Sequence, residues 1–318
     1  MPVSAPARER PDPRTSGVLG AATASTLVYS AAVSIPYMGL LAAVSPFPII
    51  LLRIRNSLGA ALLATMLAAG TIGSIFSLGL AVVYLAVFAA PGLLIGEAMA
   101  RGRGLRKGCA WAFALLVVQI GMTLLFAGPE IVDQWIKPLD YYHSPEFAAD
   151  MRSSGLPQEQ VEELSQQFLS LQQMLRVVYP AVFIIGAALM VLLNATLLAG
   201  YLARRDPGWL DGGEFEDIRW GLGLSVAFVA AGLAVLAPVL RPAAYNVLLV
   251  LGFFYALQGF AVVGYYARRL AAPLLLRIAV MVLVLVNPWA PQILGLIGLF
   301  DTWIDFRKYA QPPEELKR

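Results

Sequence analysis

The sequence contains very little cysteine, histidine or charge. Its 318 residues include one cysteine, Cys109, and one histidine, His143, and only 14% of them are charged. A single cysteine excludes an internal disulfide, and these two residues are too few for a zinc site with three or four Cys and His ligands. Soluble domains carry about 25% charged residues. We therefore expect no metal and no other cofactor, and the composition argues against a soluble protein.

Several catalytic and nucleotide-binding motifs are also missing. The chain has no glycine-rich phosphate-binding loop, no serine or cysteine nucleophile constellation and no HExxH helix. The sequence therefore encodes no energy source, so transport would require a partner ATPase or an ion gradient. The net charge of +3 comes from basic residues in short loops between apolar runs. That pattern indicates membrane orientation and gives no sign of a nucleic-acid partner.

Long apolar runs, by contrast, are abundant. Hydrophobic residues make up 59% of the chain, and several runs reach the roughly 17–25 residues that cross a bilayer. We predict an all-α polytopic protein of the bacterial cytoplasmic (inner) membrane, with eight to ten membrane segments, some of them short and broken by proline. The apolar runs cover about residues 17–36, 38–52, 57–75, 77–100, 108–127, 177–203, 218–240, 243–267 and 271–300.

A polar insert divides the chain into two hydrophobic halves. The expected parts are a disordered cytoplasmic tail 1–16, a transmembrane half 17–127, an extracytoplasmic helical insert 128–176, a second transmembrane half 177–308 and a polar tail 309–318. The first tail holds four prolines and three arginines. A cleaved signal peptide over residues 1–24 is the alternative, but the apolar run continues past it, which favours an uncleaved first span.

The insert has the pattern of a helix with one apolar stripe. Ser144 and Pro145 are typical of a helix N-cap followed by proline in the first turn. After Gly155, the stripe has helical spacing and consists of Val161, Leu164, Phe168, Leu171 and Leu175. It could pack on the chain itself, lie on the membrane or pair with a partner helix. Leu164 and Phe168 are the candidate partner-docking residues.

The last apolar run, 271–300, contains Asn287-Pro288-Trp289-Ala290-Pro291, which predicts a turn between two short helices, 271–287 and 291–306. Pro291 suits the first turn of the second helix. With the N-terminus inside, this hairpin places 19 Lys and Arg residues inside and 4 outside, whereas a single span gives 15 and 8. The positive-inside rule therefore favours the hairpin and a cytoplasmic C-terminus.

A second proline break and several buried amides predict a polar cavity. Pro46 and Pro48 interrupt a short apolar segment, and irregular backbone at membrane depth must be buried in protein or face a cavity. Amides within the spans can also hydrogen-bond across helices without any ligand, each worth about 0.6 kcal/mol. They are Gln119, Asn194, Asn246, Gln258 and Asn287. The predicted ligand-binding residues are Pro46, Pro48, Asn194, Gln258 and Asn287.

Two groups of charged residues lie in or near the spans. Glu97 precedes Arg101 by one helical turn, which predicts a structural ion pair. Asp301 and Asp305 are also one turn apart, with Arg307 and aromatic residues around them. A carboxylate pair for metal or catalysis is conceivable there, but no third ligand is evident. We interpret this group as a helix end at headgroup level, with Arg307 in the cytoplasmic charge belt.

The C-terminal stretches YALQGFAVVGYYARR (255–269) and LGLIGLFDTWIDFRKY (294–309) resemble the YybS-like family of bacterial membrane proteins, whose shared domain has no established activity. The residues that carry the resemblance are Gln258, Gly259, Asn287, Pro288, Gly295, Asp301, Asp305, Phe306 and Arg307. That family is similar to the substrate-binding S components of energy-coupling factor transporters. The SPFPI stretch (45–49) is similar to their opening, although the insert and the last spans make this chain longer.

These observations predict a transporter-like membrane subunit that binds a small molecule and lacks its own ATPase. Its expected partners are the lipid bilayer and an energising membrane module. The alternative is a membrane scaffold that docks other proteins through the outer helix or the cytoplasmic loops. A third interpretation is an intramembrane lipid enzyme that uses Glu97, Asp301 or Asp305, although no catalytic residue is assigned.

Overall fold

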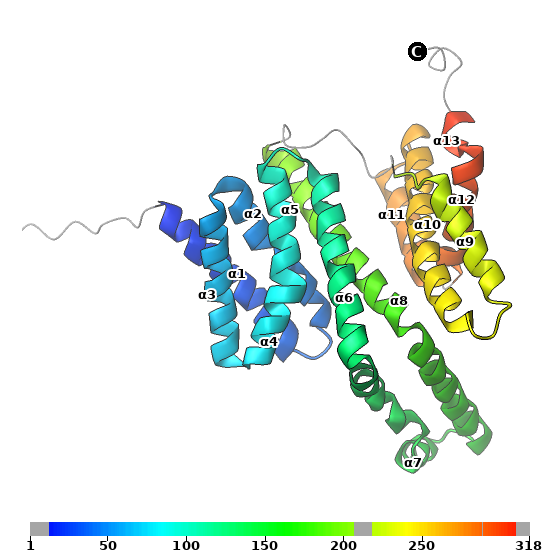
Figure 1. The fold of residues 1–318 in the computed structure, drawn as a ribbon. Coiled ribbons are helices and arrows are strands. Elements are labelled where there is room, and N and C mark those ends of the chain that lie inside the picture. The colour runs from blue at the N-terminus through cyan, green and yellow to red at the C-terminus, as the bar shows by residue number, and fades with distance from the viewer. Residues whose placement is uncertain (1–12, 207–217, 288, 310–318) are drawn as a thin grey trace, which may run out of the picture. The chain divides into compact units, whose positions relative to one another are not determined.

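The computed structural model describes residues 13–206, 218–287 and 289–309, and within these ranges it contains helices and no strand (Figure 1). Pro288 of the predicted turn, and residues 1–12 and 310–318 of the two predicted tails, lie outside the described residues. The chain forms two compact units, Met1–Met122 with Gly186–Gly212, and Thr123–Ile185 with Gly213–Arg318. Each unit is described by itself.

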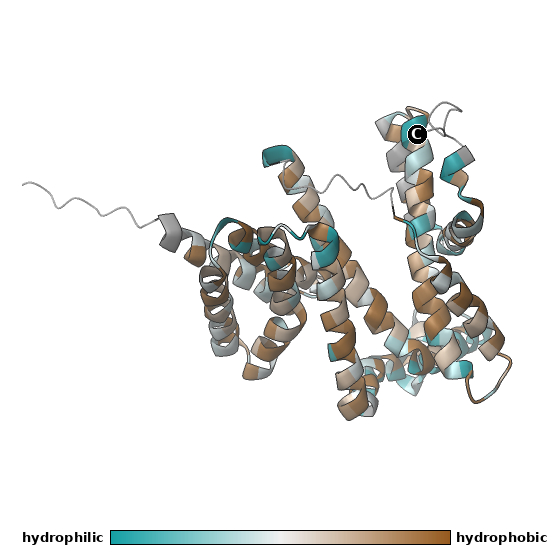
Figure 2. Cartoon of the chain, turned by 45° about the horizontal axis from the view of Figure 1, so that its top comes forward, coloured by the Kyte–Doolittle hydropathy of each residue, from teal (hydrophilic) through white to brown (hydrophobic). Residues whose placement is uncertain are grey.

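Six helices are long and apolar enough to cross a membrane. They cover Gly17–Ser34, Leu58–Ile75, Leu78–Ala100, Leu105–Gly128, Gln158–Arg205 and Arg241–Arg269. Shorter apolar helices cover Leu222–Ala234 and Ala290–Ile304. Figure 2 shows hydrophobic ribbon along most of these helices, with hydrophilic residues gathered near their ends. The predicted all-α polytopic membrane architecture with proline-broken short segments is confirmed.

The first unit is built on α1 (Pro13–Ser34), α3 (Leu58–Ile75) and the segment α4 (Leu78–Val83), η2 (Tyr84–Ala89) and α5 (Ala90–Ala100). Ala61, Ala64 and Ala68 of α3 are fully buried, so their small side chains let neighbouring helices approach closely. Helix α1 begins at Pro13, four residues before the predicted span, because proline is well suited to the first turn of a helix.

The predicted apolar run 38–52 does not form one span. It divides into η1 (Gly39–Val44), a 3₁₀ helix, and α2 (Phe47–Arg55). Pro46 is the N-cap residue of α2 and Pro48 lies in its first turn, where a missing N–H breaks no helical hydrogen bond. Two prolines in three residues therefore end one helix and start the next, and leave a break between residues 44 and 47.

Two long helices pass through both units. Helix α6 (Leu105–Ile136) has a kink at Ala127, and α8 (Gln158–Arg205) contains Pro180. Within the first unit they pack together through Leu116 of α6 and Val191 of α8, which belong to one apolar cluster (Figure 1). The predicted insert comprises the end of α6, η3 (Lys137–His143), α7 (Pro145–Ser153) and the start of α8.

The hydrogen bonds around Pro180 involve a side chain from another helix. Asn246 of α10 (Arg241–Arg269) accepts from the N–H of Ala181 at 2.9 Å and donates to the carbonyl of Val177 at 2.8 Å. Val177 and Ala181 are four residues apart, which is the spacing of a helical hydrogen bond. The Asn246 amide therefore bridges the carbonyl and the N–H of one such pair, beside the proline. The neighbouring helix thereby satisfies polar backbone groups beside a proline, as membrane proteins require.

The second unit also contains α9 (Leu222–Ala234), α11 (Leu274–Val286), α12 (Ala290–Ile304) and α13 (Phe306–Tyr309). The predicted hairpin turn is confirmed, because α11 ends and α12 begins on either side of it. Helices α10 and α12 approach so closely that a methyl group on Gly259 would overlap the carbonyl of Leu294. A methyl group on Gly298 would likewise overlap the carbonyl of Tyr255.

Replacing Gly298 with alanine should therefore destabilise the second unit. The added carbon must separate two backbones, and overpacking of this kind costs about 1–3 kcal/mol. Gly252→Ala is the matched control, since nothing lies within 4 Å of its added carbon and alanine favours the helix by up to about 1 kcal/mol. Thermal unfolding in detergent measures both variants. An unchanged midpoint for Gly298→Ala would contradict the close approach of α10 and α12.

Candidate functional site

The break between η1 and α2 is surrounded by buried hydroxyl groups. The Ser25 hydroxyl donates to the carbonyl of Ser45 at 2.6 Å, and it lies 2.6 Å from the hydroxyl of Tyr84. A serine hydroxyl has one hydrogen, so Tyr84 is the donor in the second bond. All three side chains are fully buried. Side chains from α1 and η2 therefore bond to backbone and side-chain groups at the break.

Asn194 of α8 completes this centre. Its Nδ2 donates to the carbonyl of Ala43, directly before the break, at 2.7 Å, and to Met190 of its own helix at 2.9 Å. Only 1% of Asn194 is exposed, yet its Oδ1 has no hydrogen-bond partner among the described residues. Pro46 packs on Gly92, where a methyl group would come within 2.6 Å of the proline ring. The structure thus brings together Asn194 and the segment that contains Pro46 and Pro48.

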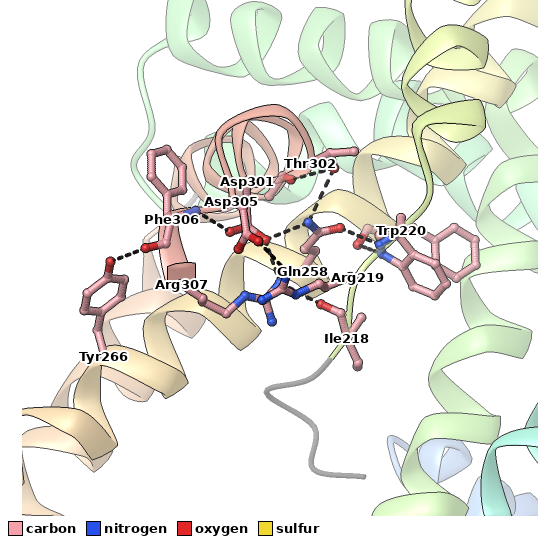
Figure 3. Close-up of polar contacts among 12 residues, drawn as sticks. Ile218, Arg219, Trp220, Gln258, Tyr266, Asp301, Thr302, Asp305, Phe306 and Arg307 are labelled. Carbon is pink, nitrogen blue, oxygen red and sulfur yellow. Dashed lines mark hydrogen bonds and ion pairs between the residues drawn. The ribbon is translucent and has the colours of Figure 1, made fainter. Parts of the chain in front are cut away.

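A second buried polar centre lies at the end of α12 (Figure 3). The guanidinium of Arg307 donates to Oδ2 of Asp301 at 2.6 Å, and the two side chains are 3% and 1% exposed. Gln258 of α10 donates to the same oxygen at 2.8 Å, while the backbone N–H of Phe306 donates to Oδ1 at 3.1 Å. Three donors therefore stabilise the charge of the Asp301 carboxylate inside the protein.

This centre also fixes the segment that precedes α9. Oε1 of Gln258 accepts from the backbone N–H of Trp220 at 2.9 Å, and Arg307 donates to the carbonyl of Ile218 at 3.0 Å. The indole of Trp220 donates to the carbonyl of Phe254 at 2.7 Å. One carboxylate, one guanidinium and one amide thereby join α10, α12 and residues 218–220.

The helix end at Asp305 differs from the expected one. Helix α12 stops at Ile304, and Asp305 adopts a left-handed backbone conformation with φ of 50°. This turn brings Arg307 back toward Asp301, so Arg307 is buried within the protein. Its expected position at headgroup level stays a prediction. Asp305 instead pairs with Arg219 at 2.7 Å, an ion pair in which both side chains are partly exposed.

Glu97 lies in a third group of charges, in the first unit. It pairs with Arg101 at 2.5 Å, as its helical spacing predicts, and with Arg53 of α2, also at 2.5 Å. Gly96 has no side chain, which lets α2 approach α5 closely enough for this second pair. An added methyl group at Gly96 would lie 2.9 Å from the Cβ of Arg53. The carboxylate is therefore held between two guanidinium groups, one of which comes from the segment after the proline break.

Comparison with known proteins gives one family. The family described as predicted membrane protein (DUF2232) matches residues 23–302. The chain belongs to the DUF2232 family. The match includes both polar centres with the exception of Phe306 and Arg307. No curated protein matches the chain, and no solved structure matches it.

The remaining predicted site residues of this DUF2232 protein lie elsewhere. Asn287 caps the hairpin turn, where its Oδ1 accepts from the N–H of Trp289 at 2.9 Å. Gln258 instead contacts Asp301, near the other end of α12. Asn287 precedes α12, and Asp301 lies eleven residues after the start of α12 at Ala290, or about 16 Å along the helix at 1.5 Å per residue. The two amides therefore do not line a common site in the second unit.

The predicted docking residues lie against the insert itself. Leu164 and Phe168 are half-buried, and the Phe168 ring stacks on Tyr142 of η3 at 4.2 Å between centroids. As predicted, Ser144 caps α7 by accepting from the N–H of Phe147 at 3.2 Å. Tyr141 donates to Asp150 at 2.6 Å, and this bond raises the pKa of the tyrosine.

Four residues of these centres were not predicted from the sequence: Ser25, Tyr84, Trp220 and Arg53. A serine or tyrosine inside an apolar run gives a weak signal, since either can bond to its own helix or simply face a neighbour. Tyr84 begins the π-helical segment η2, and such segments are frequent at functional sites. The π-helix is visible only in the structure, so the sequence alone did not identify Tyr84.

Removal of one partner from the Asp301–Arg307 pair should strongly destabilise the second unit. Arg307→Met leaves a buried carboxylate without its counter-ion, which typically costs about 3–5 kcal/mol. The double variant Asp301→Leu/Arg307→Met should recover much of that loss, since no buried charge remains. Arg219→Ala, which breaks the partly exposed pair, is the control and should cost at most about 1 kcal/mol.

Thermal and denaturant unfolding of the three variants in detergent measure these differences. An equal loss of stability in Arg307→Met and Arg219→Ala would show that Asp301 is not buried as described. A double variant no more stable than Arg307→Met would show that the pair is needed for more than charge neutralisation.

Proposed function

We propose that this protein is a membrane subunit that binds a small, partly apolar molecule in its first unit and has no ATPase of its own. Membership of a family of predicted membrane proteins supports the membrane location. The observation that carries the ligand proposal is the Oδ1 of Asn194, which is buried in the first unit and has no hydrogen-bond partner in the part of the chain that the structure describes. The proposed compartment is the bacterial cytoplasmic membrane, with both termini inside.

A buried acceptor without a donor is costly and uncommon in native proteins. Asn194 cannot rotate its amide to relieve this without losing its two donated bonds to Ala43 and Met190. A ligand that supplies an N–H or O–H group would satisfy the oxygen and leave both bonds intact. The apolar cluster of the first unit includes Met190 and Leu198, which lie four residues before and after Asn194 on α8, and Phe47 packs against that cluster. This combination favours a small molecule with one polar donor on a largely apolar body.

The polar groups around the break are suited to hold such a site in place. Ser25, Tyr84 and the Asn194 amide nitrogen bond to the break or to each other, so the prolines do not leave these backbone carbonyls exposed. The resemblance of SPFPI to the opening of energy-coupling factor S components supports the same assignment. It also supports a partner module as the source of energy, since the chain itself has no nucleotide-binding loop.

Asn194→Leu should abolish retention of the ligand. The test is native mass spectrometry of the protein purified in mild detergent from its own host, with the retained small-molecule mass as readout. Asn246→Leu is the matched control, because Asn246 also bonds two backbone groups of another segment but lies in the second unit. The control should retain the mass that Asn194→Leu loses.

Thermal unfolding of both variants separates ligand loss from misfolding. If Asn194→Leu is misfolded, Asn194→Asp provides a second test, since its carboxylate keeps the acceptor at Oδ1 but donates to neither carbonyl. A wild-type protein that carries no small molecule, or an Asn194→Leu variant that folds and keeps it, would contradict the proposal.

A membrane scaffold is the second candidate, and one observation favours it. Leu171 and Met174 of α8 remain 39% and 54% exposed, although Phe168 and Leu164 are covered within the chain. A partner helix would therefore dock on Leu171 and Met174. An enzyme is less well supported, because Asp301 and Glu97 each bond to guanidinium groups inside the chain.

The scaffold interpretation predicts that Leu171→Glu/Met174→Glu releases a protein that co-purifies with the wild-type chain. The exposed neighbour Gln173→Glu adds charge on the same helix without removing apolar surface, and it should keep the partner. Affinity purification from the host with quantitative proteomics measures both. Retention of every co-purifying protein by the double variant would rule out docking through this face.

A further inference from the structure

The second unit contains an apolar hollow that the proposed ligand site does not use. Its volume is about 470 Å³, and it lies among α10, α11, α12 and the start of α13. Its walls include Val262, Tyr266 and Leu270 of α10, Leu276 of α11, Ile297 of α12, and Phe306. From Val262 to Leu270 the hollow follows eight residues of α10, or about 12 Å at 1.5 Å per residue.

The lining has almost no capacity for hydrogen bonds. The tyrosine hydroxyl of Tyr266 is a polar group in the wall, and it donates to the carbonyl of Phe306 at 2.7 Å. Figure 3 shows this bond beside the Asp301–Arg307 pair, to which Phe306 is also bonded through its N–H. The buried ion pair therefore helps to hold Phe306, which forms one wall of the hollow, in place. A polar occupant would lose its hydrogen bonds with water here, whereas a hydrocarbon chain would lose none.

Basic residues adjoin one end of the hollow along the chain. Leu270, at that end, directly follows Arg269, and Lys308 lies two residues after Phe306; both basic side chains are exposed. Among the described residues, Asp301 and Asp305 are each paired with another arginine. These two carboxylates are therefore already paired. The predicted topology places this end at the cytoplasmic surface, where anionic lipid head groups accumulate.

We infer that the hollow binds an anionic phospholipid, with one acyl chain among Val262, Leu276 and Ile297 and the head group against Arg269 and Lys308. An apolar cleft with a basic rim between membrane helices matches the two halves of such a molecule. A zwitterionic lipid has no net charge for the rim to attract. The bound lipid holds α11 against α10 and α12, and it is separate from the ligand proposed for the first unit.

The test is native mass spectrometry of the full chain, delipidated and then incubated with phosphatidylglycerol or phosphatidylcholine of identical acyl chains. Phosphatidylglycerol should bind preferentially. The double variant Arg269→Gln/Lys308→Gln should weaken phosphatidylglycerol binding by about fivefold for each charge removed and leave phosphatidylcholine binding unchanged. Arg241→Gln removes a cation at the opposite end of α10 and should change the binding of neither lipid.

A substitution that fills the hollow provides a second test of the lipid site. Ala267→Trp places an indole in the lining and should abolish specific lipid binding, whereas Leu249→Trp, on the exposed surface of the same helix, should not. If Ala267→Trp does not fold, phosphatidylglycerol with a photoreactive acyl chain tests the wild type. It should crosslink between residues 262 and 280.

Equal binding of the two lipids, crosslinks confined to other segments, or a folded Ala267→Trp that keeps its lipid would each overturn the inference. Binding of free fatty acid in place of phospholipid would also overturn it. Asn194→Leu should leave lipid binding unchanged, so failure of the lipid site and failure of the proposed ligand site are distinguishable.

Discussion

The structure depends on one constraint: a polar backbone group at membrane depth must find its hydrogen-bond partner within the protein. At three places beside apolar segments, a side chain from another helix bonds to the backbone at a helix end or beside a proline. At the η1–α2 break these are Ser25 and Asn194. At Pro180 it is Asn246, and at the end of α12 it is Tyr266, which reaches Phe306.

These contacts explain why apolar helices with little charge adopt a defined arrangement. In lipid there is little hydrophobic driving force between helices, so association relies on close packing and on hydrogen bonds between helices. Gly259 and Gly298 provide the close packing of α10 and α12. The buried Asp301–Arg307 pair adds a penalty for any arrangement that separates its partners. Packing thus brings the helices together, while the bonds from Gln258 to Asp301 and from Arg307 to Ile218 connect α10, α12 and the segment before α9 at one position.

The sequence was sufficient to predict the fold class, the two proline breaks and the identity of most polar side chains involved. Apolar run length and proline chemistry are local properties, and local properties can be deduced from a sequence. The partners could not be deduced, because Asn194 and Ala43 are 151 residues apart and Arg307 and Ile218 are 89 apart. The burial of Arg307 against Asp301 could not be deduced either, because the left-handed turn at Asp305, a non-glycine residue, has no clear sequence signal.

The difference between a structural and a ligand-binding amide can be drawn from Asn194 and Asn246. Both are asparagines that extend from a long helix to the backbone of another segment at a proline. Asn246 uses its oxygen and its nitrogen beside Pro180, so the protein satisfies both groups. Asn194 is more deeply buried and uses its nitrogen, while its oxygen has no hydrogen-bond partner among the described residues. This unmet acceptor is the reason that we propose a ligand for Asn194 and a structural role for Asn246.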